Sequence, residues 1–270
     1  MKKMSFKKIS LIIILIILVI LSSISIYEKL TINKKYYINE KNLQIPVFVY
    51  HHIVEDEKMV NEDWMETPFD TFKKQINGLI KLGYRPISYK DLIDYKNGKK
   101  KIYKKSFLIT FDDGYTDVYK YAFKYAREKN IPMTTFLIND KVGEPGYYTW
   151  EEAKEMHDSG IMGVYSHGYT HIKYEYETPR KTLELTNKSY NELTEKLNDK
   201  KLLKIFTYPY GSYNNKELKL LYRNGYIQNL TDNKINNSNN LKLYGIHRCY
   251  PLNDSLNKIL LKIYYRDIRY

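Results

Sequence analysis

The sequence predicts an α/β fold in which a parallel sheet closes into an irregular (β/α) barrel of seven or eight units. Short apolar runs rich in β-forming residues alternate along the chain with segments of helical periodicity. Such alternation places parallel strands side by side, with crossover helices outside them. A doubly wound open sheet is the alternative closure. In either arrangement, sites gather beyond the carboxyl ends of the strands, and the candidate functional residues of this chain follow predicted strands.

The start of the chain predicts a membrane anchor. Four lysines within residues 1–8 precede an almost unbroken apolar run from Ile9 to Ile26, which is long enough to span a bilayer. Residues 1–8 should therefore stay in the cytoplasm and residues 9–27 should form a transmembrane signal anchor, with the rest outside the cell. A cleaved signal peptide is the alternative, and it would leave a secreted, wall-associated protein. Residues 28–44 are polar and predict a linker, so residues 45–270 form one folded domain.

Composition narrows the class of partner. The net charge is +13, which in an exported chain suits a cell wall or acidic lipid and argues against nucleic acid. The lysines are spread along the sequence, which predicts an evenly solvated surface for most of them. Cys249 is the only cysteine, so no disulfide can form within the chain. We expect a monomer that depends on its apolar core.

Within the folded domain, strand and helix patterns alternate, with Gly83 as a helix stop, Ser88 as a helix cap and a capping box at 149–152. A polar loop is expected over 232–240. The predicted strands are 45–50, 85–87, 106–111, 132–138, 161–165, 203–208, 226–230 and 243–248. The predicted helices are 69–82, 89–95, 116–129, 150–158, 178–198, 214–223 and 254–264.

Two adjacent carboxylates, Asp112 and Asp113, stand at the end of the strand predicted at 106–111, and Gly114 then allows a sharp turn. Adjacent side chains on an extended chain point to opposite sides, so one carboxylate can bind a metal ion while the other faces a reacting atom. Two like charges this close need a cation or a proton to compensate them. The pair therefore predicts a metal site.

Two histidines, His167 and His171, follow the strand predicted at 161–165. Two neutral imidazoles and one carboxylate leave open positions on a tetrahedral or octahedral ion, which is typical of a catalytic metal site. We therefore expect one divalent ion. Zn²⁺ suits these ligands, and Fe²⁺, Co²⁺ or Ni²⁺ would also fit. Such an ion lowers the pKa of its bound water toward ~7.

A third segment, Thr207-Tyr208-Pro209-Tyr210-Gly211, follows the strand predicted at 203–208. Proline and glycine fix a loop at the strand end. Such a loop can aim a backbone N–H at a developing oxyanion, and an ordinary tight turn is the alternative.

Together the three segments resemble the polysaccharide deacetylases of carbohydrate esterase family 4. The matching segments are 110–114, 166–171 and 208–211, in the order and at the separations of that family, and the similarity covers roughly residues 45–265. The resemblance implies the irregular barrel of the NodB-homology type and makes 45–270 a catalytic domain. It also implies a metal-dependent hydrolase that removes acetyl groups from N-acetylglucosamine units of an extracellular polymer.

The resemblance also implies roles for the residues. Asp112 would be the general base, and Asp113 would bind the metal together with His167 and His171. The backbone N–H of Tyr210, in the turn with Pro209 and Gly211, would bind the oxyanion. A histidine would protonate the leaving amine. We expect His51 in that role, with His247 as its rival, while His52 supports the fold or the rim of the site.

The start of the domain, residues 45–53, resembles the exported branch that deacetylates poly-N-acetylglucosamine, the biofilm exopolysaccharide. In that branch the acid histidine lies near the N-terminus, as if the barrel were circularly permuted. This polymer is therefore the first expected substrate, and peptidoglycan is the second. A non-catalytic glycan-binding protein, and an esterase acting on acetylated xylan or a small molecule, are the remaining alternatives.

Three departures from the family pattern affect the site. Thr207 occupies the place where many members have an arginine that orients the base, and Arg248 could supply the missing cation from another strand. The Asp-x-x-Asp-Trp element of the wider family is not evident. Gly168 replaces the usual Ser or Thr between the histidines. These departures leave the metal ligands intact, but they affect how well Asp112 can act as a base and hence the reaction rate.

Overall fold

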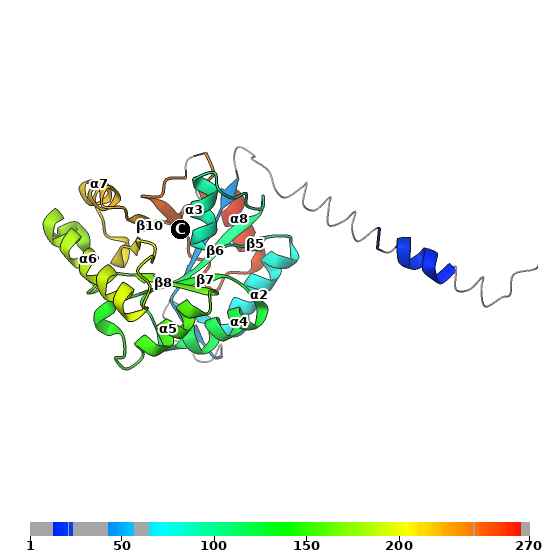
Figure 1. Ribbon diagram of the computed structural model, residues 1–270, viewed down its shortest axis with the longest axis horizontal. Helices are drawn as coiled ribbons and strands as arrows, with labels where there is room; N and C mark the ends of the chain where they lie inside the picture. The colour runs from blue at the N-terminus through cyan, green and yellow to red at the C-terminus, as the bar shows by residue number, and fades with distance from the viewer. Residues whose placement is uncertain (1–12, 21, 24–42, 57–64, 240, 266–270) are drawn as a thin grey trace, which may run out of the picture.

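Parallel strands form the wall of a nearly closed barrel in the computed structural model (Figure 1). The structure describes residues 13–20, 22–23, 43–56, 65–239 and 241–265. The strands follow the order β12-β10-β9-β8-β7-β6-β2, and every pair in this order is parallel. Their bounds are β2 Val47–Tyr50, β6 Ser106–Phe111, β7 Met133–Leu137, β8 Met162–Ser166, β9 Ile205–Thr207, β10 Ile227–Thr231 and β12 Ile246–Arg248.

The barrel closes where the chain's first wall strand meets its last. Phe48 and Cys249 form a parallel bridge just beyond β12. The Val49 N–H donates to the Cys249 carbonyl at 3.0 Å, and the Cys249 N–H donates to the Val47 carbonyl at 2.9 Å. The prediction of a barrel is therefore confirmed over that of an open sheet.

The wall strands are buried on both faces, which explains why they stand out in the sequence as continuous apolar runs. Every residue of β2, β6 and β7 is buried. One face of each strand contacts the barrel interior and the other contacts the surrounding helices. In the core outside the barrel, the ring of Phe72 packs against the rings of Tyr50, Phe111 and Tyr125.

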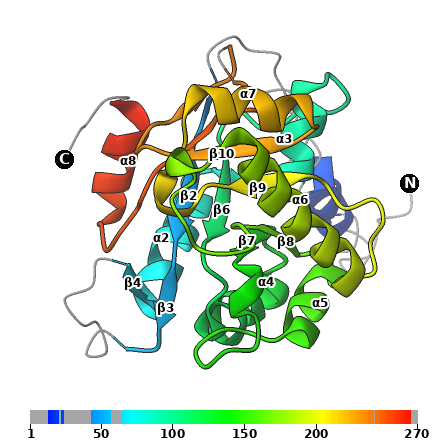
Figure 2. The ribbon, with the colours of Figure 1, turned by 90° about the vertical axis from the view of Figure 1, so that its left-hand side faces the viewer.

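Helices surround the strands, as Figure 2 shows for α4 to α8. Their bounds are α2 Phe69–Lys81, α3 Tyr89–Lys96, α4 Lys124–Lys129, α5 Trp150–Asp158, α6 Pro179–Lys196, α7 Asn215–Arg223 and α8 Leu256–Tyr264. Capping boxes at Ser88, Thr149 and Asn214 begin α3, α5 and α7 by satisfying backbone N–H groups of the first turn. The predicted caps at Ser88 and Thr149 are thus confirmed.

Helix α3 covers the end of the barrel from which the strands begin. Its residues Tyr89, Leu92 and Ile93 share one buried cluster with interior side chains such as Val47 and Ile205. The opposite end, where the strands finish, stays open to loops. The fold therefore leaves one end of the barrel available for a site.

Short elements complete the described structure. The strands are β1 Gln44–Ile45, β3 His52–Val54, β4 Glu66–Pro68, β5 Arg85–Pro86 and β11 Asn236–Asn237, and the other helical segments are Val118–Phe123, Asn139–Lys141, Tyr174–Tyr176 and Pro209–Gly211. Strands β3 and β4 pair in parallel beside the open end of the barrel, whereas β5 extends the wall beside β6.

Two predicted segments differ in the structure. The loop predicted over 232–240 contains β11, which pairs antiparallel with β1. The amide of Asn236 accounts for this strand, because it donates to the carbonyls of Ile45 and His247 and accepts from the His247 N–H. The helix predicted over 116–129 begins as a π-helix at Val118–Phe123 before it continues as α4. Apolar spacing does not distinguish one wide turn from an α-helical turn.

Within the part of the chain that the structure describes, no helix is both long enough and apolar enough to cross a membrane. Residues 13–20 are helical. The cytoplasmic segment predicted at 1–8 lies outside the described residues, as do residues 9–12, 21 and 24–27 of the predicted anchor and residues 28–42 of the predicted linker.

Candidate metal and catalytic site

A pocket of about 410 Å³ opens at the ends where the barrel strands finish. It gathers side chains from segments that are far apart in the sequence. Its lining residues are His51, Met65, Asp112, Asp113, Tyr115, His167, His171, Tyr208, Tyr210, Gly211, Thr231 and Tyr250.

The two adjacent carboxylates, Asp112 and Asp113, lie at the end of β6 and contact different side chains. The Asp112 N–H donates to the Tyr50 carbonyl at 3.0 Å, which continues the pairing of β6 with β2. Asp113 then adopts a left-handed conformation, with φ of 71°, and Gly114 follows at φ of 93°. Aspartate tolerates this region better than most residues. The divergence of the carboxylates thus depends on a turn at Asp113 as well as on the alternation of a strand.

Asp113 faces the two predicted histidines. Its Oδ1 atom lies 3.3 Å from His167 Nε2 and 3.4 Å from His171 Nε2. One potential ligand atom from each residue lies within 4.8 Å of the others. The second ring nitrogen of His167, Nδ1, lies 3.1 Å from the Thr207 carbonyl. An N–H at Nδ1 donating to that carbonyl leaves the Nε2 lone pair directed toward Asp113.

These three side chains fit a divalent metal ion. Asp113 Oδ1 is buried and makes no hydrogen bond within the described residues, so it offers a lone pair to a cation. Burial raises the pKa of Asp113, but contacts with His167 and the other histidines outweigh it and hold the pKa well below its ordinary value. Burial and the neighbouring His167 lower the pKa of His171 to about 4, so its ring is neutral at pH 7. A carboxylate and two imidazoles suit Zn²⁺ and similar ions.

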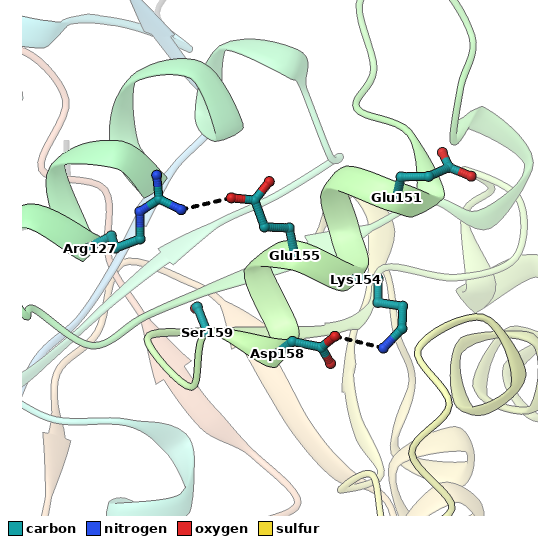
Figure 3. Close-up of a pocket in the computed structure, with 6 residues that line it drawn as sticks. All are labelled: Arg127, Glu151, Lys154, Glu155, Asp158 and Ser159. Atoms are coloured by element: carbon teal, nitrogen blue, oxygen red, sulfur yellow. Dashed lines mark hydrogen bonds and ion pairs between the residues drawn. The ribbon is translucent and has the colours of Figure 1, made fainter.

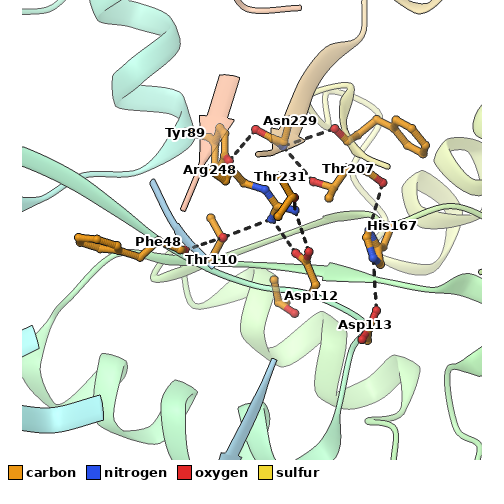
Figure 4. Close-up of polar contacts among 12 residues, drawn as sticks. Phe48, Tyr89, Thr110, Asp112, Asp113, His167, Thr207, Asn229, Thr231 and Arg248 are labelled. Carbon is orange, nitrogen blue, oxygen red and sulfur yellow. Dashed lines mark hydrogen bonds and ion pairs between the residues drawn. The ribbon is translucent and has the colours of Figure 1, made fainter. Parts of the chain in front are cut away.

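Asp112 forms a buried, bidentate ion pair with Arg248 (Figure 4). The two terminal guanidinium nitrogens donate to Oδ1 and Oδ2 of Asp112, each at 2.7 Å. Arg248 is 0% exposed and Asp112 is 3% exposed. Burial raises the pKa of Asp112, but the charge of Arg248 outweighs it and the pKa lies below its ordinary value. Asp112 is therefore an ionised carboxylate of fixed orientation.

Neighbouring hydroxyl groups hold the guanidinium in place. Arg248 donates to Thr231 Oγ1 at 2.6 Å and to Thr110 Oγ1 at 3.4 Å. Thr110 in turn donates to the Phe48 carbonyl at 2.7 Å. Four strands, β2, β6, β10 and β12, thus contribute to one polar network inside the barrel (Figure 4).

Thr207, which stands where the family resemblance leads one to expect an arginine, belongs to a different network. Its Oγ1 accepts from Asn229 Nδ2 at 3.0 Å, and Asn229 Oδ1 accepts from the Tyr89 hydroxyl at 2.8 Å (Figure 4). These side chains fill the barrel interior beside the guanidinium. The cation beside Asp112 therefore comes from β12 rather than from β9.

His51 lies in the pocket, directly after β2. It is 8% exposed, and its ring is nearly parallel to that of Tyr250, with the centroids 6.0 Å apart. Burial lowers the pKa of His51, although the carboxylates of Asp112 and Asp113 act in the opposite direction. The residue is placed to exchange a proton with a molecule bound in the pocket.

The other two candidate histidines lie outside the pocket lining. His52 Nδ1 lies 2.6 Å from Asp117 Oδ2, and its ring packs on Tyr115 at 3.5 Å between centroids. Burial lowers the pKa of His52, but the hydrogen bond to Asp117 raises it more. His247 Nδ1 lies 2.9 Å from Asp232 Oδ2. Both rings are thus held by a carboxylate of their own.

The turn at Pro209–Gly211 places Tyr210 at the mouth of the pocket. Tyr210 has φ of 59°, and the Gly211 N–H donates to the Tyr208 carbonyl at 3.0 Å. The Tyr210 ring is 63% exposed and lies 4.3 Å from the His171 ring, between centroids. The backbone of this turn, as well as the ring, therefore borders the cavity.

The sequence analysis did not single out four pocket residues, Met65, Tyr115, Thr231 and Tyr250. Thr231 ends β10, Tyr250 comes shortly after β12, and Tyr115 follows the Asp-Asp-Gly turn. Their positions after strand ends are the signal that could have identified them. Met65 lies before β4 and carries no comparable signal.

Another hollow, beside α4 and α5, has different chemistry. Arg127 Nη1 lies 2.7 Å from Glu155, and Lys154 Nζ lies 2.7 Å from Asp158, as Figure 3 shows. These pairs are exposed to solvent, and the hollow contains no histidine or cysteine. It has no ligand set comparable to that of the pocket at the strand ends.

The comparisons with known proteins agree with this geometry. Residues 99–228 match the model of the polysaccharide deacetylase family. YxkH of Bacillus subtilis, which is named for the same family, is 29% identical over 217 residues, which cover 77% of this chain and 72% of that protein. A poly-β-1,6-N-acetyl-D-glucosamine N-deacetylase of Staphylococcus aureus is 29% identical over 167 residues, 57% of this chain and 57% of that enzyme's length.

Solved structures show the same fold. The Streptococcus pyogenes deacetylase PplD superposes with a TM-score of 0.73 at 24% identity, covering 82% of this chain and 99% of PplD. IcaB from Ammonifex degensii superposes with a TM-score of 0.69 at 24% identity, covering 83% of this chain and 98% of IcaB.

We expect the purified chain to bind about one equivalent of Zn²⁺. His171→Ala should weaken Zn²⁺ binding by more than about 100-fold, because removing a residue that only hydrogen-bonds to a metal ligand already weakens binding about 10–100-fold. His157→Ala, which removes a histidine on α5, is the matched control and should leave binding unchanged. Metal content by mass spectrometry and titration calorimetry measure the effect. Equal affinity in both variants would contradict the assignment of His171 as a ligand.

We expect Arg248→Met to destabilise the fold by about 3–5 kcal/mol, because it leaves the Asp112 carboxylate buried without its partner. Adding Asp112→Leu to this variant should recover most of the loss, since the unpaired charge is then removed. Chemical denaturation measures the free energy of unfolding. If Arg248→Met lowers the free energy of unfolding by less than about 1 kcal/mol, the ion pair does not stabilise the fold.

Proposed function

We propose that this chain, which carries a polysaccharide deacetylase domain, removes acetyl groups from N-acetylglucosamine units of an extracellular polysaccharide. The polysaccharide deacetylase family comprises hydrolases that act on the amide bonds of N-acetyl sugars. One observation carries the proposal. A potential metal-binding triad, Asp113, His167 and His171, shares a pocket with a second carboxylate, Asp112, that an arginine holds ionised.

Poly-β-1,6-N-acetylglucosamine is the proposed polymer, and peptidoglycan is the alternative. The name of the Staphylococcus aureus relatives supports the first. The position of His51 directly after the first wall strand, as in the branch that the sequence resembles, supports it too. The arginine missing at Thr207 is the best support for a non-catalytic protein, and the ion pair of Arg248 with Asp112 weakens that support.

Asp113, His167 and His171 would hold one divalent ion, for which Zn²⁺ is the proposed identity and Fe²⁺, Co²⁺ and Ni²⁺ are alternatives. When bound, the ion would supply Lewis-acid chemistry that activates water and polarises the acetamide carbonyl. The buried Oδ1 atom of Asp113 accepts no hydrogen bond within the described residues, so a bound cation would compensate its charge.

Asp112 is the proposed general base. Its carboxylate lines the pocket, and the bidentate contact with Arg248 fixes its orientation. From this position it would accept a proton from the attacking water. Arg248 acts through Asp112 and is thus a positioning residue, since it does not line the pocket.

His51 is the proposed proton donor to the amine nitrogen as the C–N bond breaks. It lines the pocket, whereas His247 does not and has its Nδ1 directed at Asp232. The nitrogen must take up a proton to leave as a neutral amine. Pocket geometry therefore favours His51 over His247.

The turn that contains Pro209, Tyr210 and Gly211 is proposed to stabilise the developing oxyanion. Preorganised backbone N–H groups contribute most where water is excluded, and this turn borders the pocket. We further propose that residues 9–27 anchor a monomeric enzyme in the cell membrane with its domain outside, as the sequence predicts.

We expect wild type to release acetate from β-1,6-linked N-acetylglucosamine oligomers more rapidly than from peptidoglycan fragments. A chelator should abolish the activity, and Asp112→Asn should lower kcat by about 10²–10⁴-fold, the usual contribution of a general base. Asp140→Asn, an acidic residue at the same end outside the pocket lining, is the control and should retain activity. An oligomer that binds yet yields no acetate with any divalent ion would sink the proposal.

We expect His51→Gln to lower kcat at least about 100-fold, because the leaving amine loses its proton donor. His247→Gln should keep kcat within about threefold of wild type, because this ring lies outside the pocket. Steady-state kinetics of acetate release compare the two variants. The reverse ranking would assign the acid role to His247.

A further inference from the structure

Lysines gather at the end of the barrel opposite the pocket. We define the basic end as α3 with the loop after it, residues 89–105, and the connections 197–204 and 238–245, which lead into β9 and β12. These segments carry eleven lysines against three aspartates. The lysines are Lys90, Lys96, Lys99, Lys100, Lys101, Lys104, Lys105, Lys200, Lys201, Lys204 and Lys242. Spread along the sequence, they are brought together by the fold.

The pocket end has the opposite charge. Its described segments are the connections that follow the strand ends, at 55–56, 112–117, 138–149, 167–178, 208–214, 232–235 and 249–255. Together they carry eleven acidic residues against three lysines. Positive charge therefore gathers at one end of the barrel axis and negative charge at the other. The net charge of the chain does not reveal this separation.

Helix ends alone do not account for the basic end. Lysine and arginine are favourable in the last turn of a helix, but residues 99–105 lie beyond α3. Two of the three aspartates are already paired with lysines, Asp94 with Lys90 and Asp91 with Lys100. The surplus of lysine side chains is mostly exposed, so the surface presents positive charge to solvent.

Exposed apolar side chains adjoin these lysines. Tyr264 is 62% exposed and Leu82 is 43% exposed. Lys105 Nζ donates to the Leu82 carbonyl at 3.0 Å, and Lys104, Lys105 and Tyr264 line one shallow recess. Tyrosine, leucine and lysine side by side are typical of surfaces that lie in a membrane interface.

The chain enters the barrel at this same end. Leu43 lines the recess with Lys104 and Lys105, and its N–H donates to Ser238 Oγ at 2.9 Å. Residues 1–42, with the apolar run from Ile9 to Ile26, precede it. The apolar run is therefore joined to the folded domain at the basic end.

We propose that the basic end docks on the surface of an anionic lipid bilayer. Positive charge matches acidic headgroups, and Leu82 and Tyr264 would enter the interface beside them. A soluble anionic polymer would use the lysines but gives no reason for the exposed apolar side chains. In the docked orientation the pocket faces away from the lipid, toward polymer outside the cell.

The test uses the full chain with vesicles of phosphatidylcholine alone or with 30% phosphatidylglycerol, and follows amide hydrogen exchange. We expect exchange in 97–105 and 197–204 to slow at least about tenfold with anionic lipid, and high salt to reverse the effect. Because each lysine changes association roughly fivefold, the triple variant Lys99→Glu, Lys101→Glu, Lys201→Glu should weaken docking roughly 100-fold or more. The readout is confined to this face, so it does not depend on how residues 1–42 associate with lipid.

The matched control is the triple variant Lys74→Glu, Lys124→Glu, Lys219→Glu, which makes the same charge change on the exposed sides of α2, α4 and α7. It should keep the protection. Unchanged Zn²⁺ content would show that both variants fold. Equal exchange in the two lipids would overturn the proposal. So would protection of 142–148 at the pocket end instead, or protection by soluble polyphosphate in the absence of anionic lipid.

Discussion

Two adjacent buried carboxylates at the end of β6 are the constraint around which the site is built. Asp112 and Asp113 are 3% and 5% exposed, and neither charge is stable there without compensation. The fold compensates them separately. Arg248 neutralises Asp112, and the histidine pair with the proposed cation neutralises Asp113. Each compensating group comes from a different strand, so both carboxylates can be buried in their ionised form only when the barrel is assembled.

Barrel closure is therefore part of the site's electrostatics. Arg248 ends β12, which meets β2 at the bridge between Phe48 and Cys249, and β2 lies between β12 and β6. The guanidinium reaches Asp112 across the barrel end, supported by Thr231 and Thr110. An open sheet would place the first and last strands at opposite edges and leave Asp112 without this partner. The same closure brings His51, directly after the first wall strand, beside Tyr250, which follows the last.

The cation beside the proposed base has changed strands relative to the family pattern. Thr207 and Asn229 occupy the interior beside it and hydrogen-bond to each other. A guanidinium from β9 would have to displace this pair. What the site requires is a buried positive charge with bidentate geometry toward Asp112, and more than one strand of a barrel can supply it.

The sequence by itself determined the elements and the chemistry of the candidate site. Apolar periodicity and caps located the wall strands and helices, and the residue types at strand ends identified Asp112, Asp113, His167 and His171. Only the tertiary structure decided which of His51 and His247 borders the pocket, and that Arg248 pairs with Asp112. It alone showed that scattered lysines share one end of the barrel. The physical reason is that these relations depend on contacts between strands distant in sequence, whereas periodicity, capping and residue chemistry are local.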